Sequence, residues 1–168
     1  MLKIMKIVAI ILTFNEAKHI KRCIDSISST VDKIYVIDSF STDNTKNISI
    51  DSGAIFLCNK FINHSLQFNW ALNQLDKDTD WVLRIDADEY LTPELAYEIK
   101  HKVAKLDHLI NGVYLSRRII FLGKLLRYGG IFPNKVIRLF KYGYGQCDYR
   151  WMDERIKVEE RSHSLKII

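Results

Sequence analysis

The sequence predicts an α/β fold: a single domain with a mostly parallel central sheet flanked by helices, and a mixed or antiparallel C-terminal extension. Three observations support this prediction. The chain has 168 residues, of which 48% are hydrophobic, so it can bury one core. Before residue 107, short β-branched runs alternate with apolar residues at helical spacing. Beyond Gly112 this alternation gives way to short strands joined by Gly-containing loops.

The first strand is expected over residues 6–12, because the continuous aliphatic run at 7–12 is typical of a parallel strand buried on both faces. A helix follows, because its apolar residues fall at helical spacing: Ile20, Cys23, Ile24 and Ile27. Then come, in chain order, a strand over 33–37, a short helix closed by Gly53, a strand over 54–57, a helix over 66–75, a strand over 81–85, a helix capped by Thr92 with Pro93 at its first position, and strands over 113–117 and 136–140.

The charge of the chain is positive and unevenly placed. The net charge is +5, and residues 111–152 contain one acid, Asp148, against eight bases: Arg117, Arg118, Lys124, Arg127, Lys135, Arg138, Lys141 and Arg150. This stretch indicates an anionic partner, which phosphate groups on a small substrate, an anionic membrane surface or nucleic acid would satisfy. No recognised nucleic-acid-binding motif accompanies the bases, so nucleic acid is not expected as a partner.

The sequence offers no membrane span or secretory signal. Its longest aliphatic run, residues 7–12, is far shorter than the roughly 20 residues that cross a bilayer. The first six residues lead straight into the first strand without a small-residue cleavage site. We therefore expect a cytoplasmic protein, with peripheral contact at the inner face of the plasma membrane as a further expectation.

An acidic cluster follows the strand at 81–85. Asp86, Asp88 and Glu89 place three carboxylates within four residues, and such groups repel each other unless a cation or solvent neutralises them. Oxygen ligands at this spacing suit Mg²⁺ or Mn²⁺, and a metal here could bridge a diphosphate. The alternative interpretation is an acidic turn that ends the strand and leads to the Thr92 cap.

Two further polar clusters follow the first and second strands: residues 13–16 (Thr-Phe-Asn-Glu) and Asp38. Because neighbouring parallel strands end at one edge of a sheet, these side chains should share a crevice. Asp38 could accept a hydrogen bond from a base N–H there, and Phe14 could flank a ring. The sequence has no Gly-x-Gly-x-x-Gly or Gly-Lys-Ser/Thr motif, which disfavours dinucleotide and P-loop binding. The alternative role of Asn15, Asp38 and Ser41 is helix capping.

Four ordered segments carry a resemblance: IVAIILTFNE, IYVIDSFSTDNT, WVLRIDADEYLTPEL and RYGGIFPNKVIRLFKYG. Together they resemble the family 2 glycosyltransferases of GT-A fold, and most nearly the lipopolysaccharide core enzymes that add a glucose to heptose. The resemblance covers about residues 5–160. It implies one GT-A-like domain over residues 1–168, with a nucleotide-sugar-binding half at 5–107 and an acceptor-side half at 108–160.

The resemblance also implies roles for single residues on the donor side. Base and ribose would be held by the residues after the first strand: Thr13, Asn15 and Glu16. Asp38 matches the acid that contacts the uracil. Asp86 would lie by the ribose and the donor sugar, and Asp88 would bind the metal on the diphosphate.

On the acceptor side, the segment GGIFPNKVIRLF departs from the family at Asn134, where an acid is common. The late His-Glu or Glu-Asp pair of the family, which supplies the base, matches Asp153 and Glu154, with Asp153 standing where the nearest relatives often have His. A carboxylate must take the proton of the attacking sugar hydroxyl, and Glu154 is the first candidate. Arg138 could help to stabilise the departing diphosphate.

The implied function is a metal-dependent, inverting transfer of a hexose from a nucleotide-sugar, UDP-linked by expectation, to a cell-envelope glycan or glycolipid. The implied cofactor is Mg²⁺ or Mn²⁺. The alternative is a truncated, non-catalytic nucleotide-sugar-binding module, because family members usually continue well beyond 168 residues.

Overall fold

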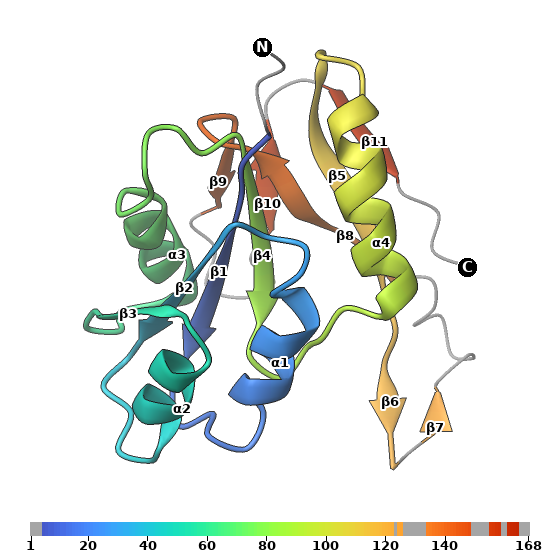
Figure 1. The fold of residues 1–168 in the computed structure, drawn as a ribbon. Helices are drawn as coiled ribbons and strands as arrows, with labels where there is room; N and C mark the ends of the chain where they lie inside the picture. Colours follow the sequence, from blue (N-terminus) through green and yellow to red (C-terminus); the bar gives the residue numbers. More distant parts are fainter. Residues whose placement is uncertain (1–4, 123, 126–133, 149–154, 159–160, 165–168) are drawn as a thin grey trace.

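The structure, a computed structural model, describes residues 5–122, 124–125, 134–148, 155–158 and 161–164. A seven-stranded sheet with the order β11-β5-β8-β4-β1-β2-β3 runs through the molecule (Figure 1). Strands β1 to β4 are mutually parallel where they pair. Their bounds and those of the helices that connect them are β1 (Ile7–Thr13), α1 (Ile20–Ile27), β2 (Lys33–Asp38), α2 (Thr45–Asp51), β3 (Ile55–Cys58), α3 (His64–Leu72) and β4 (Trp81–Asp86).

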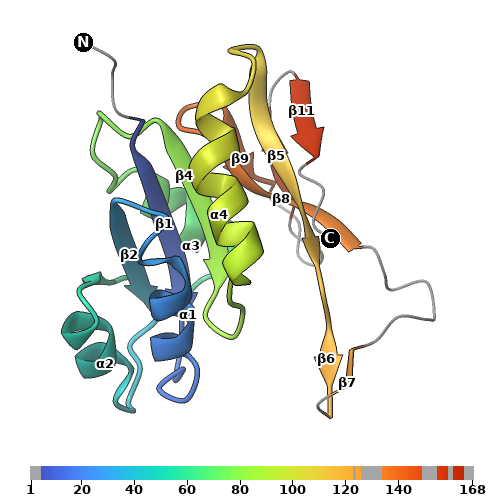
Figure 2. The ribbon, with the colours of Figure 1, turned by 45° about the vertical axis from the view of Figure 1, so that its right-hand side comes forward.

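The rest of the chain makes the sheet mixed. Strand β8 lies between β4 and β5 and is antiparallel to both, whereas β11 is parallel to β5. A hairpin, β6–β7, extends beyond the main sheet (Figures 1 and 2), and β9 pairs antiparallel with β10. The bounds are α4 (Pro93–Lys102), a 3₁₀ turn (Val103–Lys105), β5 (Ile110–Arg117), β6 (Ile120–Phe121), β7 (Lys124–Leu125), β8 (Asn134–Lys141), β9 (Gly145–Cys147), β10 (Ile156–Val158) and β11 (Arg161–Ser164).

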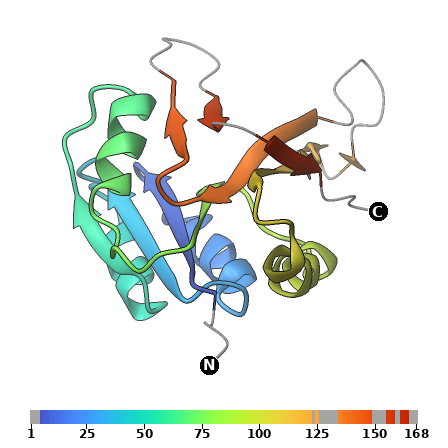
Figure 3. The same cartoon turned by 90° about the horizontal axis from the view of Figure 1, so that it is seen from above.

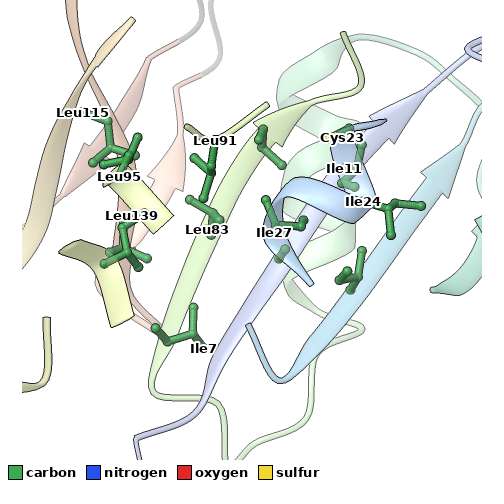
Figure 4. Packing of buried hydrophobic residues seen from close by; sticks show 14 of the residues in the cluster. Ile7, Ile11, Cys23, Ile24, Ile27, Leu83, Leu91, Leu95, Leu115 and Leu139 are labelled. Atoms are coloured by element: carbon green, nitrogen blue, oxygen red, sulfur yellow. The ribbon is translucent and has the colours of Figure 1, made fainter. Parts of the chain in front are cut away.

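One face of the sheet is covered by α1 and α4 (Figure 3). The apolar residues of α1 that occur at helical spacing are all buried against alternate residues of β1 and β4, such as Ile11 and Leu83 (Figure 4). Leu95 and Ile99 of α4 pack on the same face, beside Leu139 of β8. These contacts make α1, α4 and the sheet one continuous core.

The other face is covered by α3 together with β9 and β10. Its centre is an edge-to-face pair of Phe68 and Phe140, both fully buried, with ring centroids 6.2 Å apart. Gly145 of β9 lies against the Phe140 ring so closely that a Cβ would come within 2.3 Å of it. Glycine is therefore required where β9 crosses this ring.

The predicted fold class is confirmed, and most of the predicted helices and strands differ from the observed ones only at their ends. Thr92 caps α4 by accepting a hydrogen bond from the Leu95 N–H at 3.3 Å, with Pro93 at the start of the helix. The helix expected over 66–75 instead begins at His64, because the Asn63 side chain caps it, and it ends at Leu72. Within the described residues, no helix combines the length and the apolar character that membrane crossing requires.

Candidate functional site

The pairing register brings the predicted clusters to one edge of the sheet. Thr13 lies opposite Asp38, and Leu12 lies opposite Asp86. A pocket of about 450 Å³ opens at this edge. It is lined by Leu12, Thr13, Phe14, Glu16, Ser39, Phe61, His64, Gln67, Asp86, Ala87 and Asp88.

Asp38 is buried, only 2% exposed, and its carboxylate is held from within the protein. The Thr13 hydroxyl donates to Oδ1 at 2.9 Å, and the Ser41 N–H donates to Oδ2 at 2.7 Å. A buried carboxylate needs such donors, because burial without hydrogen bonds is costly. Asp38 therefore shapes the loop next to the pocket, and its contact with a base stays a prediction.

The loop after β1 is tied to the loop after β2. Asn15 has a left-handed backbone with φ of 56°, a conformation that Asn tolerates better than most residues. Its side-chain Oδ1 accepts from the Thr42 N–H at 2.9 Å, and the Glu16 N–H donates to the Thr45 hydroxyl at 2.8 Å. Because α1 has His19 at its N-cap, helix capping by Asn15 is wrong; Asn15 joins two loops instead.

Phe61 and the first turns of α3 also line the pocket. Gln67 is 1% exposed, accepts from the Asn59 side chain at 2.8 Å and donates to the Ser39 hydroxyl at 3.3 Å. Phe61 and His64 lie edge to face with ring centroids 5.1 Å apart. This part of the pocket therefore presents the rings of Phe61 and His64 to a ligand, whereas the amide of Gln67 is already hydrogen-bonded to the loop after β2.

The acidic turn at the end of β4 is neutralised by arginine. One terminal nitrogen of Arg138 donates to Asp86 at 2.7 Å and to Glu89 at 2.8 Å. Arg84 lies 3.8 Å from Asp86, and Arg117 lies 3.8 Å from Glu89. Arg138 is buried, with 9% of the residue exposed, and its guanidinium contacts these two carboxylates; its contact with a departing diphosphate stays a prediction.

The pKa values of Asp86 and Glu89 are shifted in opposite directions. Partial burial favours the protonated form of both. For Asp86, the contact with Arg138, helped by Arg84, outweighs burial and lowers the pKa. For Glu89, burial prevails, and the like charge of Asp86 adds to it, so the pKa is raised. Asp86 is therefore a carboxylate at neutral pH with its charge already balanced.

Asp88 differs from both neighbours because it is exposed and lines the pocket. Its backbone carbonyl accepts from Arg22 at 3.0 Å, whereas its carboxylate makes no hydrogen bond or ion pair within the described part of the chain. Nor do the described residues contain a group of three or more acids, His or Cys that could hold a metal alone. The residues do fit Mg²⁺ or Mn²⁺ shared with a substrate, since such ions commonly take one or two carboxylates plus phosphate oxygens.

The candidate bases cannot be placed in this pocket, because Asp153 and Glu154 lie outside the described residues. The ends of the flanking strands are close together, with the Asp148 N–H donating to the Arg155 carbonyl at 3.1 Å. The role of both acids stays a prediction.

Comparison with known families decides the class of the protein. Residues 8–146 match the model of the family described as glycosyl transferase family 2. The chain belongs to this family. The resemblance given by the four sequence segments is thereby confirmed, and the carboxyl-edge pocket is the candidate donor site of a family 2 glycosyltransferase.

Curated relatives of this family 2 member are glycosyltransferases. An uncharacterized glycosyltransferase of Rickettsia felis is 41% identical over 96 residues, which cover 57% of this chain and 33% of that protein. The lipopolysaccharide core biosynthesis glycosyltransferase LpsC of Rhizobium meliloti is 28% identical over 145 residues, covering 83% of this chain and 52% of LpsC. The chain thus spans about a third to a half of the length of these relatives.

Among solved structures, glucosyl-3-phosphoglycerate synthase from Mycobacterium tuberculosis in complex with UDP is similar, with a TM-score of 0.54 and 26% identity. The match covers 65% of this chain and 43% of that one. The same synthase is known in complex with Mn²⁺, UDP and glucosyl-3-phosphoglycerate. The GT-A-like fold expected for this family 2 member is confirmed.

Two features of the site were not singled out as site residues from the sequence. From the sequence, Glu89 is only a third acid beside Asp86 and Asp88, but in the structure it shares Arg138 with Asp86. Phe61 gave a weak signal, as an aromatic residue close before a polar helix N-terminus. It lines the pocket with 45% of its surface exposed, so its ring is accessible to a ligand there.

Proposed function

We propose that this chain carries the donor site and transfer chemistry of a metal-dependent, inverting glycosyltransferase. Its donor is a UDP-linked hexose, and its acceptor is a cell-envelope glycan or glycolipid such as lipopolysaccharide core. The observation that supports this most is the pocket at the carboxyl edge, where the Asp88 carboxylate, which has no partner among the described residues, lies beside the tied loops after β1 and β2. Membership of family 2 supports the same reaction.

In this proposal the uridine occupies the side of the pocket that faces β1 and β2. Thr13 and Glu16 line it, while Asn15 and Asp38 fix the loops around it. Phe14 is 58% exposed, so its ring is available to stack on the base. Asp86 would face the ribose and the donor sugar.

Asp88 would hold Mg²⁺ or Mn²⁺ together with the diphosphate oxygens. A bound divalent ion supplies Lewis-acid stabilisation of the negative charge that the leaving UDP develops. Asp88 suits this role because its carboxylate is exposed in the pocket, while Asp86 is already paired with Arg138.

In the transfer step, an acceptor hydroxyl oxygen forms a bond to the anomeric carbon while the bond from that carbon to the UDP oxygen breaks. The hydroxyl proton passes to a carboxylate, for which Glu154 is the first candidate and Asp153 the second. Attack from the face opposite UDP inverts the anomeric centre. Residues 108–160 would bind the acceptor, and 5–107 the donor.

Peripheral contact with an anionic membrane is part of the proposal. The β6–β7 hairpin exposes Ile120 to 56% and Leu122 to 86%, close to the basic pair Arg117 and Arg118. Apolar side chains next to bases suit an anionic leaflet. Leu122→Asp should lower sedimentation with vesicles rich in anionic lipid at least about threefold. Equal sedimentation of the variant and the unchanged chain would remove this part of the proposal.

Calorimetric titration with UDP, with and without Mn²⁺, tests the central proposal. We expect binding that depends on the ion, and a much weaker response to GDP. Glu154→Gln should keep this binding but lose transfer by about 10²-fold or more. Absence of UDP binding, or the same affinity without any divalent ion, would contradict the proposal. UDP binding without transfer to any lipid or glycan extract would favour the non-catalytic binding module.

A further inference from the structure

The Asp86–Glu89 turn is fixed from several sides. Within the turn, the Glu89 N–H donates to the Asp86 carbonyl at 2.9 Å, and the Asp86 N–H donates back to the Glu89 carboxylate at 3.2 Å. From α1, Arg22 donates to the Asp88 carbonyl at 3.0 Å and stacks over the Tyr90 ring at 4.6 Å. The backbone of the turn is thus held at both ends and at its tip.

Arg138 fixes the side chains of the same turn. It comes from β8, the strand next to β4, and its contacts at 2.7 Å and 2.8 Å draw the carboxylates of Asp86 and Glu89 to one nitrogen. Three ionised acids in four residues would otherwise repel each other and spread the turn. Two of them are bound to Arg138, whereas Asp88 lines the pocket with a carboxylate that has no partner in the described part of the chain.

We propose that Glu89 and Arg138 are positioning residues: they form a clamp that holds the turn in the shape that presents Asp88 to the metal and the diphosphate. This inference rests on the proposed donor site. Glu89 accepts hydrogen bonds from the backbone N–H of Asp86 and from the guanidinium of Arg138. It therefore connects the backbone of the turn to β8. Arg is suited to this place because its fixed, planar donors hold two carboxylates at once.

The test separates positioning from stability by measuring UDP affinity with and without Mn²⁺. Glu89→Gln keeps the size of the side chain and removes its charge. It should lower the gain in UDP affinity that Mn²⁺ provides by about tenfold, the effect typical of a residue that orients a metal ligand. UDP affinity without the ion should stay within about twofold, because the loops after β1 and β2 are untouched. A variant that merely loosened the fold would lower both affinities.

Arg138→Lys should lower the Mn²⁺-dependent gain in UDP affinity by a similar factor. The double variant should lose no more of this gain than the more affected single variant, because both changes break the same clamp. Asp25→Asn is the matched control: Asp25 pairs with Lys21 on the surface of α1, and its loss should change nothing. If Arg138→Lys does not fold, Glu89→Gln alone decides. A normal Mn²⁺ gain in Glu89→Gln overturns the clamp and leaves the proposed function intact. If Mn²⁺ does not raise the UDP affinity of the unchanged chain, both the clamp and the proposed function are overturned.

Discussion

Asp88→Asn is expected to lower the rate of sugar transfer by about 10²–10³-fold and to abolish most of the gain in UDP affinity that Mn²⁺ provides. The substitution keeps the size of the side chain and removes the charge. In the pocket, Asp88 is the acid without a partner among the described residues, whereas Asp86 is paired with Arg138. The loss should therefore be larger for Asp88 than for Glu89→Gln, which acts through the turn.

The measurement is calorimetric titration of UDP at several Mn²⁺ concentrations, alongside transfer assays. Asp51→Asn is the control, since Asp51 is an exposed acid at the end of α2 and outside the pocket. Thermal unfolding should show little change in stability for Asp88→Asn, because among the described residues its carboxylate makes no hydrogen bond or ion pair that folding would lose. Retention of full Mn²⁺-dependent binding would rule out Asp88 as the metal ligand and move attention to Asp86.

Phe140→Ala is expected to cost about 3–5 kcal/mol of the free energy of unfolding. Phe140 is fully buried between Phe68 and the backbone of Gly145, so truncation leaves a cavity that these neighbours cannot close. For a chain of this size the melting temperature should fall by about 10 °C. Urea unfolding with a lower midpoint and an unchanged slope is the decisive measurement.

Phe40→Ala is the matched control for that loss. Phe40 is 60% exposed in the loop after β2, so its truncation should change the free energy of unfolding by less than about 0.5 kcal/mol. Equal losses for the two variants would mean that the face of the sheet covered by α3 does not form the core described above.

The parallel half of the fold could be predicted well from the sequence, because its strands are short, mainly apolar runs and α1 shows clear helical spacing. Ile20, Cys23, Ile24 and Ile27 predicted the buried face of α1, and all four are buried. The end of α3 was predicted less well. Its apolar pattern continues to Leu75, but the backbone leaves the helix after Leu72, and Leu75 is buried from a turn instead.

The sequence could predict which residues lie together at the site, but it could not predict which charged side chains form ion pairs there. Strand order brings Thr13, Asp38 and Asp86 together, and the alternation of strands and helices already implied this edge. The partnership of Arg138 with Asp86 spans 52 residues and depends on β8 lying beside β4. Local patterns carry no information about such a long-range neighbour, so the sequence alone does not predict this ion pair, and the contact of Arg138 with a diphosphate stays a prediction.

The insertion of β8 between β4 and β5 also affects how the chain can fold during synthesis. Until residues 134–141 have left the ribosome, β4 presents an open edge that nothing earlier in the chain covers within this sheet. Pairing across such sequence distances slows folding and exposes strand edges to aggregation meanwhile. The nascent first half of this protein should therefore be a client of chaperones, even though its own strands and helices are strongly encoded.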